Sequence, residues 1–73
     1  MQAGIWRHYK GSYYLVLGLA VHSETSEPMV VYVSLDAALP GPRLRVRPLR
    51  GPDGWLTEVN NVARFEYIGD SIL

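Results

Sequence analysis

Hydrophobic and polar residues alternate along most of the chain with a period of two, which is typical of β-strands. The longest apolar stretch, residues 13–22 (YYLVLGLAVH), is apolar on both alternating faces. This pattern predicts a strand in the middle of a barrel or sandwich. A helix over residues 15–20 is the alternative, but the aromatic and β-branched content and Gly18 favour the strand. Gly18 also predicts a bend or a close backbone approach within it.

Four further strands are predicted, together with a short segment that fits either a strand or a helical turn. The strands cover residues 4–10, 29–35, 43–49 and 62–68, the short segment covers 55–59, and 69–73 form a tail. Turns are predicted at Gly11, through the Pro/Gly segment of residues 36–42, at 51–54 and at Asn60-Asn61. Five or six short antiparallel strands in this length predict an all-β fold, a small SH3-like or OB-like barrel.

Length and composition narrow the class of protein. The 73 residues are expected to form one domain, 1–73, which buries only about 60% of its unfolded surface. The absence of cysteine excludes disulfides and thiolate zinc sites and fits a cytoplasmic protein. No stretch approaches the roughly 20 apolar residues of a membrane span, so no membrane association is expected. No metal-ligand spacing or phosphate-binding glycine loop is present, and neither a metal nor a cofactor is predicted.

The formal net charge is zero, yet basic residues cluster in the predicted fourth strand. Arg43, Arg45 and Arg47 alternate there with Leu44 and Val46, and no acid lies between residues 40 and 51. Alternate residues of a strand lie roughly 6.5–7 Å apart, close to the spacing of neighbouring phosphates, and arginine binds phosphate or carboxylate with two prongs. The alternative is a solvated face that pairs with acids across the sheet, at Glu58 or Glu66. Zero net charge does not fit a dedicated nucleic-acid-binding protein.

A second candidate site combines two histidines with a polar loop. Its members are His8, His22, Ser23, Glu24 and Thr25. His22 could act as a general base that Glu24 orients, provided that His8 and His22 face one pocket. The alternative is that His22 caps the end of a strand and that the hydroxyls of the loop bind nearby backbone groups.

Eight large aromatic residues are many for so small a core. They are Trp6, Tyr9, Tyr13, Tyr14, Tyr32, Trp55, Phe65 and Tyr67. Small SH3-like barrels use exposed rings to hold extended peptides. The alternative is that most of these rings fill the core, which we expect for Tyr14 and Phe65 and leave open for Trp6 and Trp55.

Several short motifs occur in order along the chain. They are Arg7-His8-Tyr9-Lys10-Gly11, Tyr14, Val16-Leu17-Gly18, His22-Ser23-Glu24-Thr25 with Glu27, Val30-Val31-Tyr32, Val46-Arg47-Pro48 and Arg64-Phe65. Together they resemble the small bacterial domain-of-unknown-function family 1653 (DUF1653) over about residues 4–68. The resemblance implies a compact, mainly β domain of SH3-like character and brings no activity with it. The chain departs from the usual pattern between Leu35 and Leu44 and again around Trp55.

These observations favour a non-catalytic binding module for an anionic ligand such as RNA, a nucleotide or an acidic peptide. The candidate ligand-binding residues are Arg7, His8, Tyr9, His22, Ser23, Glu24, Thr25, Tyr32 and Arg47. One alternative is a small enzyme, or an accessory domain of one, with His22 and Glu24 as the acid–base pair. Another is a protein that works by self-association or with a protein partner, since a marginal core and an exposed edge strand favour pairing.

Overall fold

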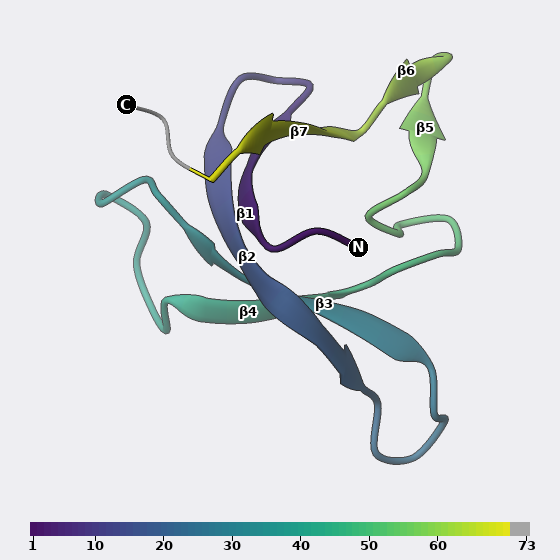
Figure 1. Cartoon of the computed structure of the whole chain (residues 1–73). Helices are drawn as coiled ribbons and strands as arrows, with labels where there is room; N and C mark the ends of the chain where they lie inside the picture. The colour runs from purple at the N-terminus through teal and green to yellow at the C-terminus, as the bar shows by residue number, and fades with distance from the viewer. Residues whose placement is uncertain (71–73) are drawn as a thin grey trace.

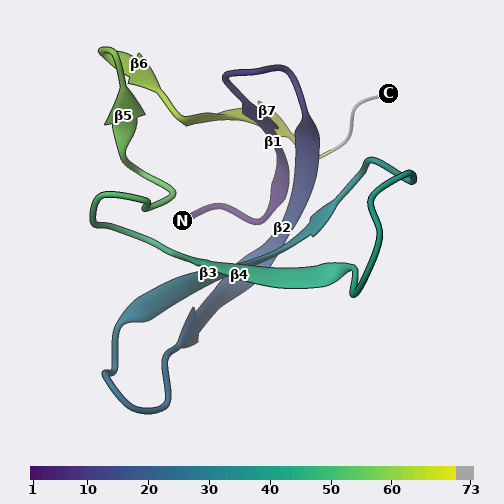
Figure 2. The same ribbon diagram turned by 180° about the vertical axis from the view of Figure 1, so that it is seen from behind.

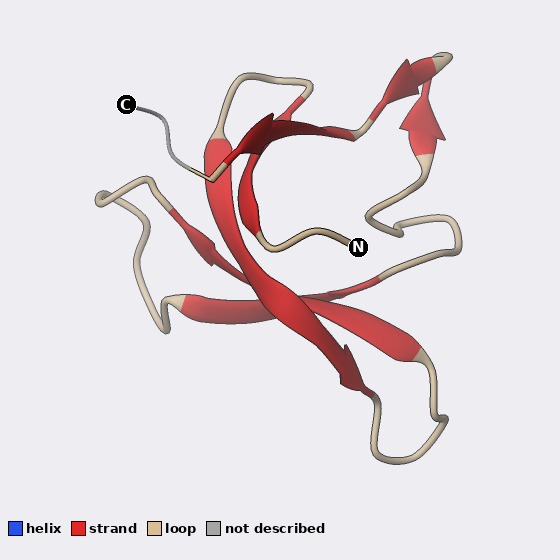
Figure 3. Cartoon of the chain, in the orientation of Figure 1, coloured by secondary structure: helices blue, strands red, loops and turns tan. Residues whose placement is uncertain are grey.

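The computed structural model describes residues 1–70, which contain strands and loops but no helix (Figure 3). The strands are β1 (Gly4–His8), β2 (Tyr13–Val21), β3 (Pro28–Ser34), β4 (Leu44–Pro48), β5 (Glu58–Val59), β6 (Val62–Ala63) and β7 (Phe65–Gly69). Five of them form one antiparallel sheet in the order β4-β3-β2-β1-β7, and β5 and β6 form a small separate hairpin. The all-β fold class is therefore confirmed.

The main sheet coils into a partly open barrel. β1 pairs with both β2 and β7, so the chain returns to its first strand, while β4 and β7 remain the two ends of the sheet. The twist is strong enough that β2 crosses β4 when the molecule is seen from either side (Figures 1 and 2). The segment from 49 to 64 connects the two ends, and it is tied to β4 where the Trp55 N–H donates to the Pro48 carbonyl at 2.8 Å.

A β-bulge interrupts β2. Val16 lies opposite Tyr32 of β3, but Gly18 lies opposite Val31, so Leu17 is an extra residue in β2. Residues directly opposite each other share a face, and the bulge therefore exchanges the two faces of β2. Strict alternation, as the sequence pattern predicts, would place Ala20 on the same face as Val16. The register instead places Leu19 there, opposite the buried Val30. The bend predicted at Gly18 is confirmed.

The core is small and largely aromatic. Its buried hydrophobic residues are Ile5, Val16, Val30, Tyr32, Leu49, Trp55 and Phe65. The ring of Trp55 lies parallel to that of Phe65 with centroids 3.7 Å apart, and Trp6 and Tyr14 pack against this cluster. Trp55 therefore belongs to the core, whereas Tyr9 and Tyr13 remain exposed. Most of the aromatic residues fill the interior, as the second interpretation of the sequence expected.

The strand ends differ from the prediction by one or two residues, except near the C-terminus. The strand predicted over 62–68 is divided at Arg64 into β6 and β7. The segment 55–59 begins as a turn and ends as β5, and Asn60 and Asn61 both have positive φ in the hairpin turn. Gly69 belongs to β7 rather than to the predicted tail, and residues 71–73 of that tail lie outside the described part of the chain.

The alternation in β4 would be expected to place its apolar residues toward the core and its arginines in solvent. The structure differs from this at Arg47, Leu44 and Val46. Arg47 lies opposite the fully buried Val30, so it belongs to the inner face of the sheet. Leu44 and Val46 point outward and are 59% and 60% exposed. Arg47 can face inward because β4 ends the sheet, where a long side chain covers the core with its stem. Arg43 and Arg45 are exposed, as expected of a solvated face.

Candidate functional site

A cavity of about 340 Å³ lies beside β4, toward the residue that precedes β7. We call it the opening cavity, because it lies between the two ends of the sheet. Its lining residues are Tyr32, Val46, Arg47, Pro48, Asp53 and Arg64. Two guanidinium groups therefore reach one cavity from opposite ends of the sheet.

Arg47 is held by contacts on both sides of its guanidinium. Its Nη1 donates to the backbone carbonyl of Asp53 at 2.9 Å, and its Cζ lies 5.5 Å from the centroid of the Phe65 ring. The second contact is a cation–π interaction, which is stronger where solvent is excluded.

Arg64 is positioned by its backbone. Its N–H donates to the carbonyl of Thr57 at 3.2 Å, and its carbonyl accepts from Tyr9 at 2.9 Å. These bonds hold the residue at the point where the chain turns from β6 into β7.

Three buried N–H donors near Phe65 have no acceptor within residues 1–70. They are Nε of Arg47, Nε of Arg64 and Nε1 of Trp55. A buried donor without an acceptor destabilises the fold by about 1–3 kcal/mol, so native proteins contain few of them. Arg47 and Trp55 both contact the Phe65 ring, and Arg64 precedes it in the chain. Trp55 is not among the residues that line the opening cavity, so a ligand there would meet the guanidinium groups of Arg47 and Arg64.

His8 lies beside the same ring and is sensitive to the local charge. Its imidazole is edge-on to Phe65 at 5.0 Å between centroids, and its Nδ1 accepts the N–H of Lys10 at 3.1 Å. Partial burial lowers the pKa of His8, and the charges of Arg47, Arg64 and Lys10 lower it further. The neutral ring carries its proton on Nε2, because Nδ1 acts as an acceptor.

Acidic groups only partly balance the cations. The Asp53 side chain belongs to a residue that lines the cavity, but within residues 1–70 neither Arg47 nor Arg64 forms a salt bridge. Glu66 pairs with Arg7 at 3.3 Å rather than with the arginines of β4. The opening cavity is therefore positive relative to a molecule whose formal net charge is zero.

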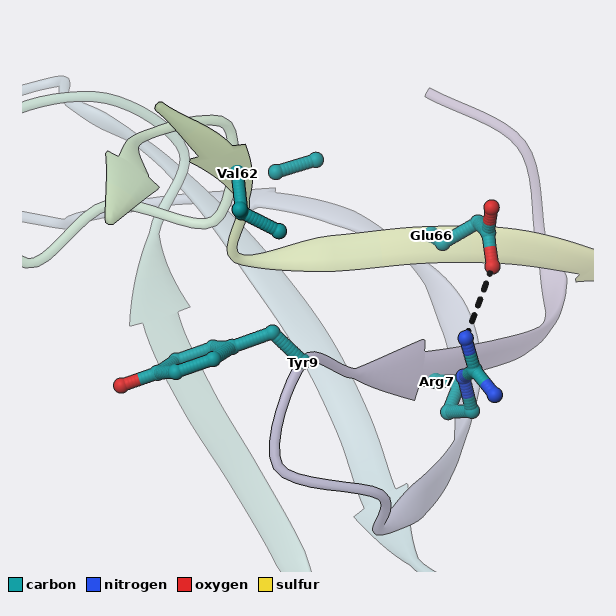
Figure 4. Close-up of a pocket in the computed structure, with 5 residues that line it drawn as sticks. Arg7, Tyr9, Val62 and Glu66 are labelled. Atoms are coloured by element: carbon teal, nitrogen blue, oxygen red, sulfur yellow. Dashed lines mark hydrogen bonds and ion pairs between the residues drawn. The ribbon is translucent and has the colours of Figure 1, made fainter. Parts of the chain in front are cut away.

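Arg7 and Tyr9 line a different cavity, of about 270 Å³, together with Val62, Ala63 and Glu66. Figure 4 shows the Arg7 guanidinium turned toward Glu66 and the Tyr9 ring projecting away from this ion pair. Both ends of the pair are about half exposed, and such pairs contribute little to stability. Arg7 is already neutralised by its partner, and this cavity is the weaker candidate for an anion.

The predicted histidine site is not assembled. His8 ends β1 beside the turn into β2, whereas His22 follows the other end of the nine-residue β2, roughly 25 Å away at the usual rise of a strand. Nδ1 of His22 accepts the backbone N–H groups of Glu24 and Thr25 at 3.2 and 3.4 Å. The Thr25 hydroxyl accepts the N–H of Glu27, and Ser23 and Glu24 are exposed. These contacts are those of a capped loop, and the enzyme hypothesis lacks the common pocket that it requires.

The structure thus brings together Tyr32 and Arg47 from the predicted set, with His8 close by. Arg64 was not among the predicted binding residues, since it lies within the continuous strand predicted over residues 62–68. Its occurrence in the Arg64-Phe65 motif of the family resemblance was the signal that could have identified it. Within residues 1–70, no three His, Asp or Glu side chains are grouped as a metal site would need, and no helix there could cross a membrane.

Comparison with known proteins places the chain near one family. The profile described as "Protein of unknown function (DUF1653)" matches residues 4–67. A crystal structure of a protein from Bordetella bronchiseptica that belongs to DUF1653 is 39% identical in sequence. It superposes with a TM-score of 0.87, over 100% of this chain and 94% of that one. No curated protein matches the chain.

Proposed function

Because the chain belongs to the DUF1653 family, whose function is unknown, we propose its function from the site itself: a non-catalytic module that binds an anionic group in the opening cavity. The observation that supports this proposal is that Arg47 and Arg64 line the same cavity from different elements and, within residues 1–70, form no salt bridge. Guanidinium groups favour negatively charged acceptors. An oxyanion in the opening cavity would balance the charges of Arg47 and Arg64.

Phosphate is the ligand group that fits this site best. It offers several acceptor oxygens to donors that converge from different elements, and arginine recognises it with two prongs. Arg45 is exposed and lies two residues before Arg47 in β4, at the roughly 7 Å spacing of alternate strand residues, so a second anionic group could be bound beside the first. RNA and a nucleotide carry phosphate groups, and an acidic peptide carries carboxylates in their place. All three remain candidate ligands.

The direct test is a titration of the ¹⁵N-labelled chain with pyrophosphate at low salt. The side-chain Nε–H signals of Arg47 and Arg64 should shift, together with the backbone amide of Phe65. Citrate in a parallel titration distinguishes carboxylate from phosphate recognition. Arg64→Gln should weaken pyrophosphate binding at least about tenfold, the usual range for loss of a charged hydrogen bond. Arg47→Lys should weaken it as well, since it keeps the charge but loses the planar fork.

Arg43→Gln is the matched control. It removes the same charge from the same region of the chain, but Arg43 donates to the carbonyls of Asp36 and Ser34, away from the cavity. Pyrophosphate affinity should therefore remain within about twofold of the unmodified chain. The proposal fails if no anion moves the two Nε–H signals, or if Arg43→Gln weakens binding as much as Arg64→Gln does.

A further inference from the structure

The outer face of β2, β3 and β4 is apolar throughout. Three rows of residues lie side by side across these strands, as the pairing register shows. The rows are Leu15, Val33 and Leu44; then Gly18, Val31 and Val46; then Ala20, Met29 and Pro48. We call these nine residues the outer apolar face. None of them carries a charge or a side-chain hydrogen-bonding group.

Such a face is unusual for a sheet that faces water. Antiparallel sheets with one solvated face normally present polar residues there, as the alternation of their strands reflects. Here β3 instead presents Val30 and Tyr32 inward and Val31 and Val33 outward. Leu44 and Val46 at the edge are more than half exposed. No described segment of the chain covers this side of β4.

The apolar surface continues at the start of β2 and just past the end of β3. Tyr13 and Leu35 are 40% and 41% exposed, and they line a hollow of about 360 Å³ with Ser12 and Asp36. A specific interface buries at least about 1,000 Å² in total, so each copy would have to contribute about 500 Å². A contiguous apolar patch of about that size is at the upper end of what a monomer usually shows.

We infer that the outer apolar face is the interface of a homodimer, in which the sheets of two copies pack face to face. A second copy suits the face because burying aliphatic side chains against each other desolvates no charge. The formal net charge of zero sets no repulsion between copies. A two-fold axis through the face would give each copy the same contacts and leave no surface for further growth.

The size of the domain supports the same conclusion. A chain of this length buries too little surface for a large stability, and small domains often gain the remainder by oligomerisation. Here the core is small, and further apolar residues lie on the outer side of the sheet. Face-to-face packing of two sheets would make β3 the centre of a sandwich, with apolar neighbours on both sides.

Sedimentation velocity between 10 μM and 1 mM tests the inference. The unmodified chain should sediment as a dimer at the upper concentration. Leu44→Glu places a charge in the interface and should raise the dimer dissociation constant at least about tenfold. Leu44 is chosen over Val46 because Val46 also lines the opening cavity, so a loss of dimer and a loss of anion binding stay distinguishable.

Leu56→Glu is the matched control, since Leu56 is 52% exposed but lies outside the three strands of the face. It should leave the dimer unchanged, and the amide spectrum of each variant should show that it is folded. A monomer at 1 mM would overturn the inference, as would a Leu44→Glu chain that still dimerises. Binding of a different protein to this face by a chain that stays monomeric would likewise overturn it.

Discussion

Phe65 links the packing of the core to the chemistry of the opening cavity. Its ring is stacked on Trp55 and lies edge-on to His8. The Cζ atom of Arg47 lies 5.5 Å from the ring centroid. A residue that is 6% exposed thus contacts both the interior and the cations of the candidate site. Substitutions around it should therefore be judged by stability and by anion binding separately.

The protonation of His8 should report anion binding. In the free protein, burial and then the charges of Arg47, Arg64 and Lys10 hold the pKa of His8 below its ordinary value of 6.5. An anion in the cavity offsets the two arginine charges, so the pKa should rise when pyrophosphate binds. Protonation of His8 then accompanies binding, so the contribution of His8 to the affinity should increase as pH falls through the interval between its free and its bound pKa.

The measurement is an NMR pH titration of the His8 ring with and without pyrophosphate. The ring of His22, near the other end of β2, serves as the reference, and its signals should not respond to the ligand at constant pH. His8→Gln should remove the contribution of His8 to the proton balance of binding, while that of the phosphate groups remains, and should leave the binding itself in place. A His8 titration curve that pyrophosphate leaves unchanged would contradict this prediction.

Trp55 should tolerate one substitution and not another. It is 1% exposed and the largest fully buried side chain, so Trp55→Ala leaves a large cavity and should destabilise the fold by about 3–5 kcal/mol. Trp55→Phe keeps a ring stacked on Phe65 and removes a buried N–H that has no acceptor in residues 1–70. Its effect should be smaller, about 1–2 kcal/mol, in urea unfolding. Equal losses of stability would mean that the N–H, which both variants lack, contributes more to stability than the volume of the ring does.

Among the elements, the turn between β4 and β5 depends on one glycine. A Cβ on Gly54 would lie 2.5 Å from the backbone carbonyl carbon of Arg50 and 2.7 Å from its oxygen, and neither atom can move aside as a side chain can. The Gly54 N–H also closes the turn by donating to Gly51 at 3.0 Å. Gly54→Ala should therefore displace Trp55 from the core and lower the free energy of unfolding by at least about 2 kcal/mol.

Gly11→Ala is the comparison for this prediction. Gly11 has φ of +109° in the turn between β1 and β2, and nothing lies within 4 Å of the added Cβ. The substitution strains the backbone by about 1 kcal/mol without any clash. Urea unfolding should rank Gly54→Ala as the more damaging of the two, and the reverse order would contradict the close approach at residue 54.

At the scale of the whole molecule, period-two patterns predicted the all-β fold because alternation directly reflects strand geometry. The bulge at Leu17 was not predictable from alternation, since one inserted residue leaves the composition of β2 unchanged while exchanging its faces. The position of Arg47 was not predictable for a related reason. An arginine row beside leucine and valine is ordinarily solvated, as Arg43 and Arg45 are, and Arg47 is partly buried because β4 ends the sheet.

The sequence predicted the types of residue that form the candidate site, but not which individual residues lie there. Arg47 and Tyr32 were identified from the arginine row and the aromatic content, and they do meet in one cavity. His22 and His8 were grouped because both can carry a proton, but the length of β2 separates them. Arg64 joins the cavity through the sheet order, in which β4 and β7 form opposite ends. Such long-range proximity is set by topology and is not encoded in local spacing.

The proposed dimer gives the whole molecule a stability that depends on concentration. If folded chains associate and unfolded chains do not, each tenfold increase in concentration adds about 0.7 kcal/mol per protomer, half of the 1.4 kcal/mol that a tenfold change represents. In a domain of this size, 1 kcal/mol shifts the Tm by roughly 4–8 °C. Raising the concentration from 10 μM to 1 mM should therefore raise the Tm by about 6–11 °C in differential scanning calorimetry. Leu44→Glu should abolish this rise and Leu56→Glu should retain it, whereas a Tm that is independent of concentration in the unmodified chain would show that the outer apolar face does not pair with itself.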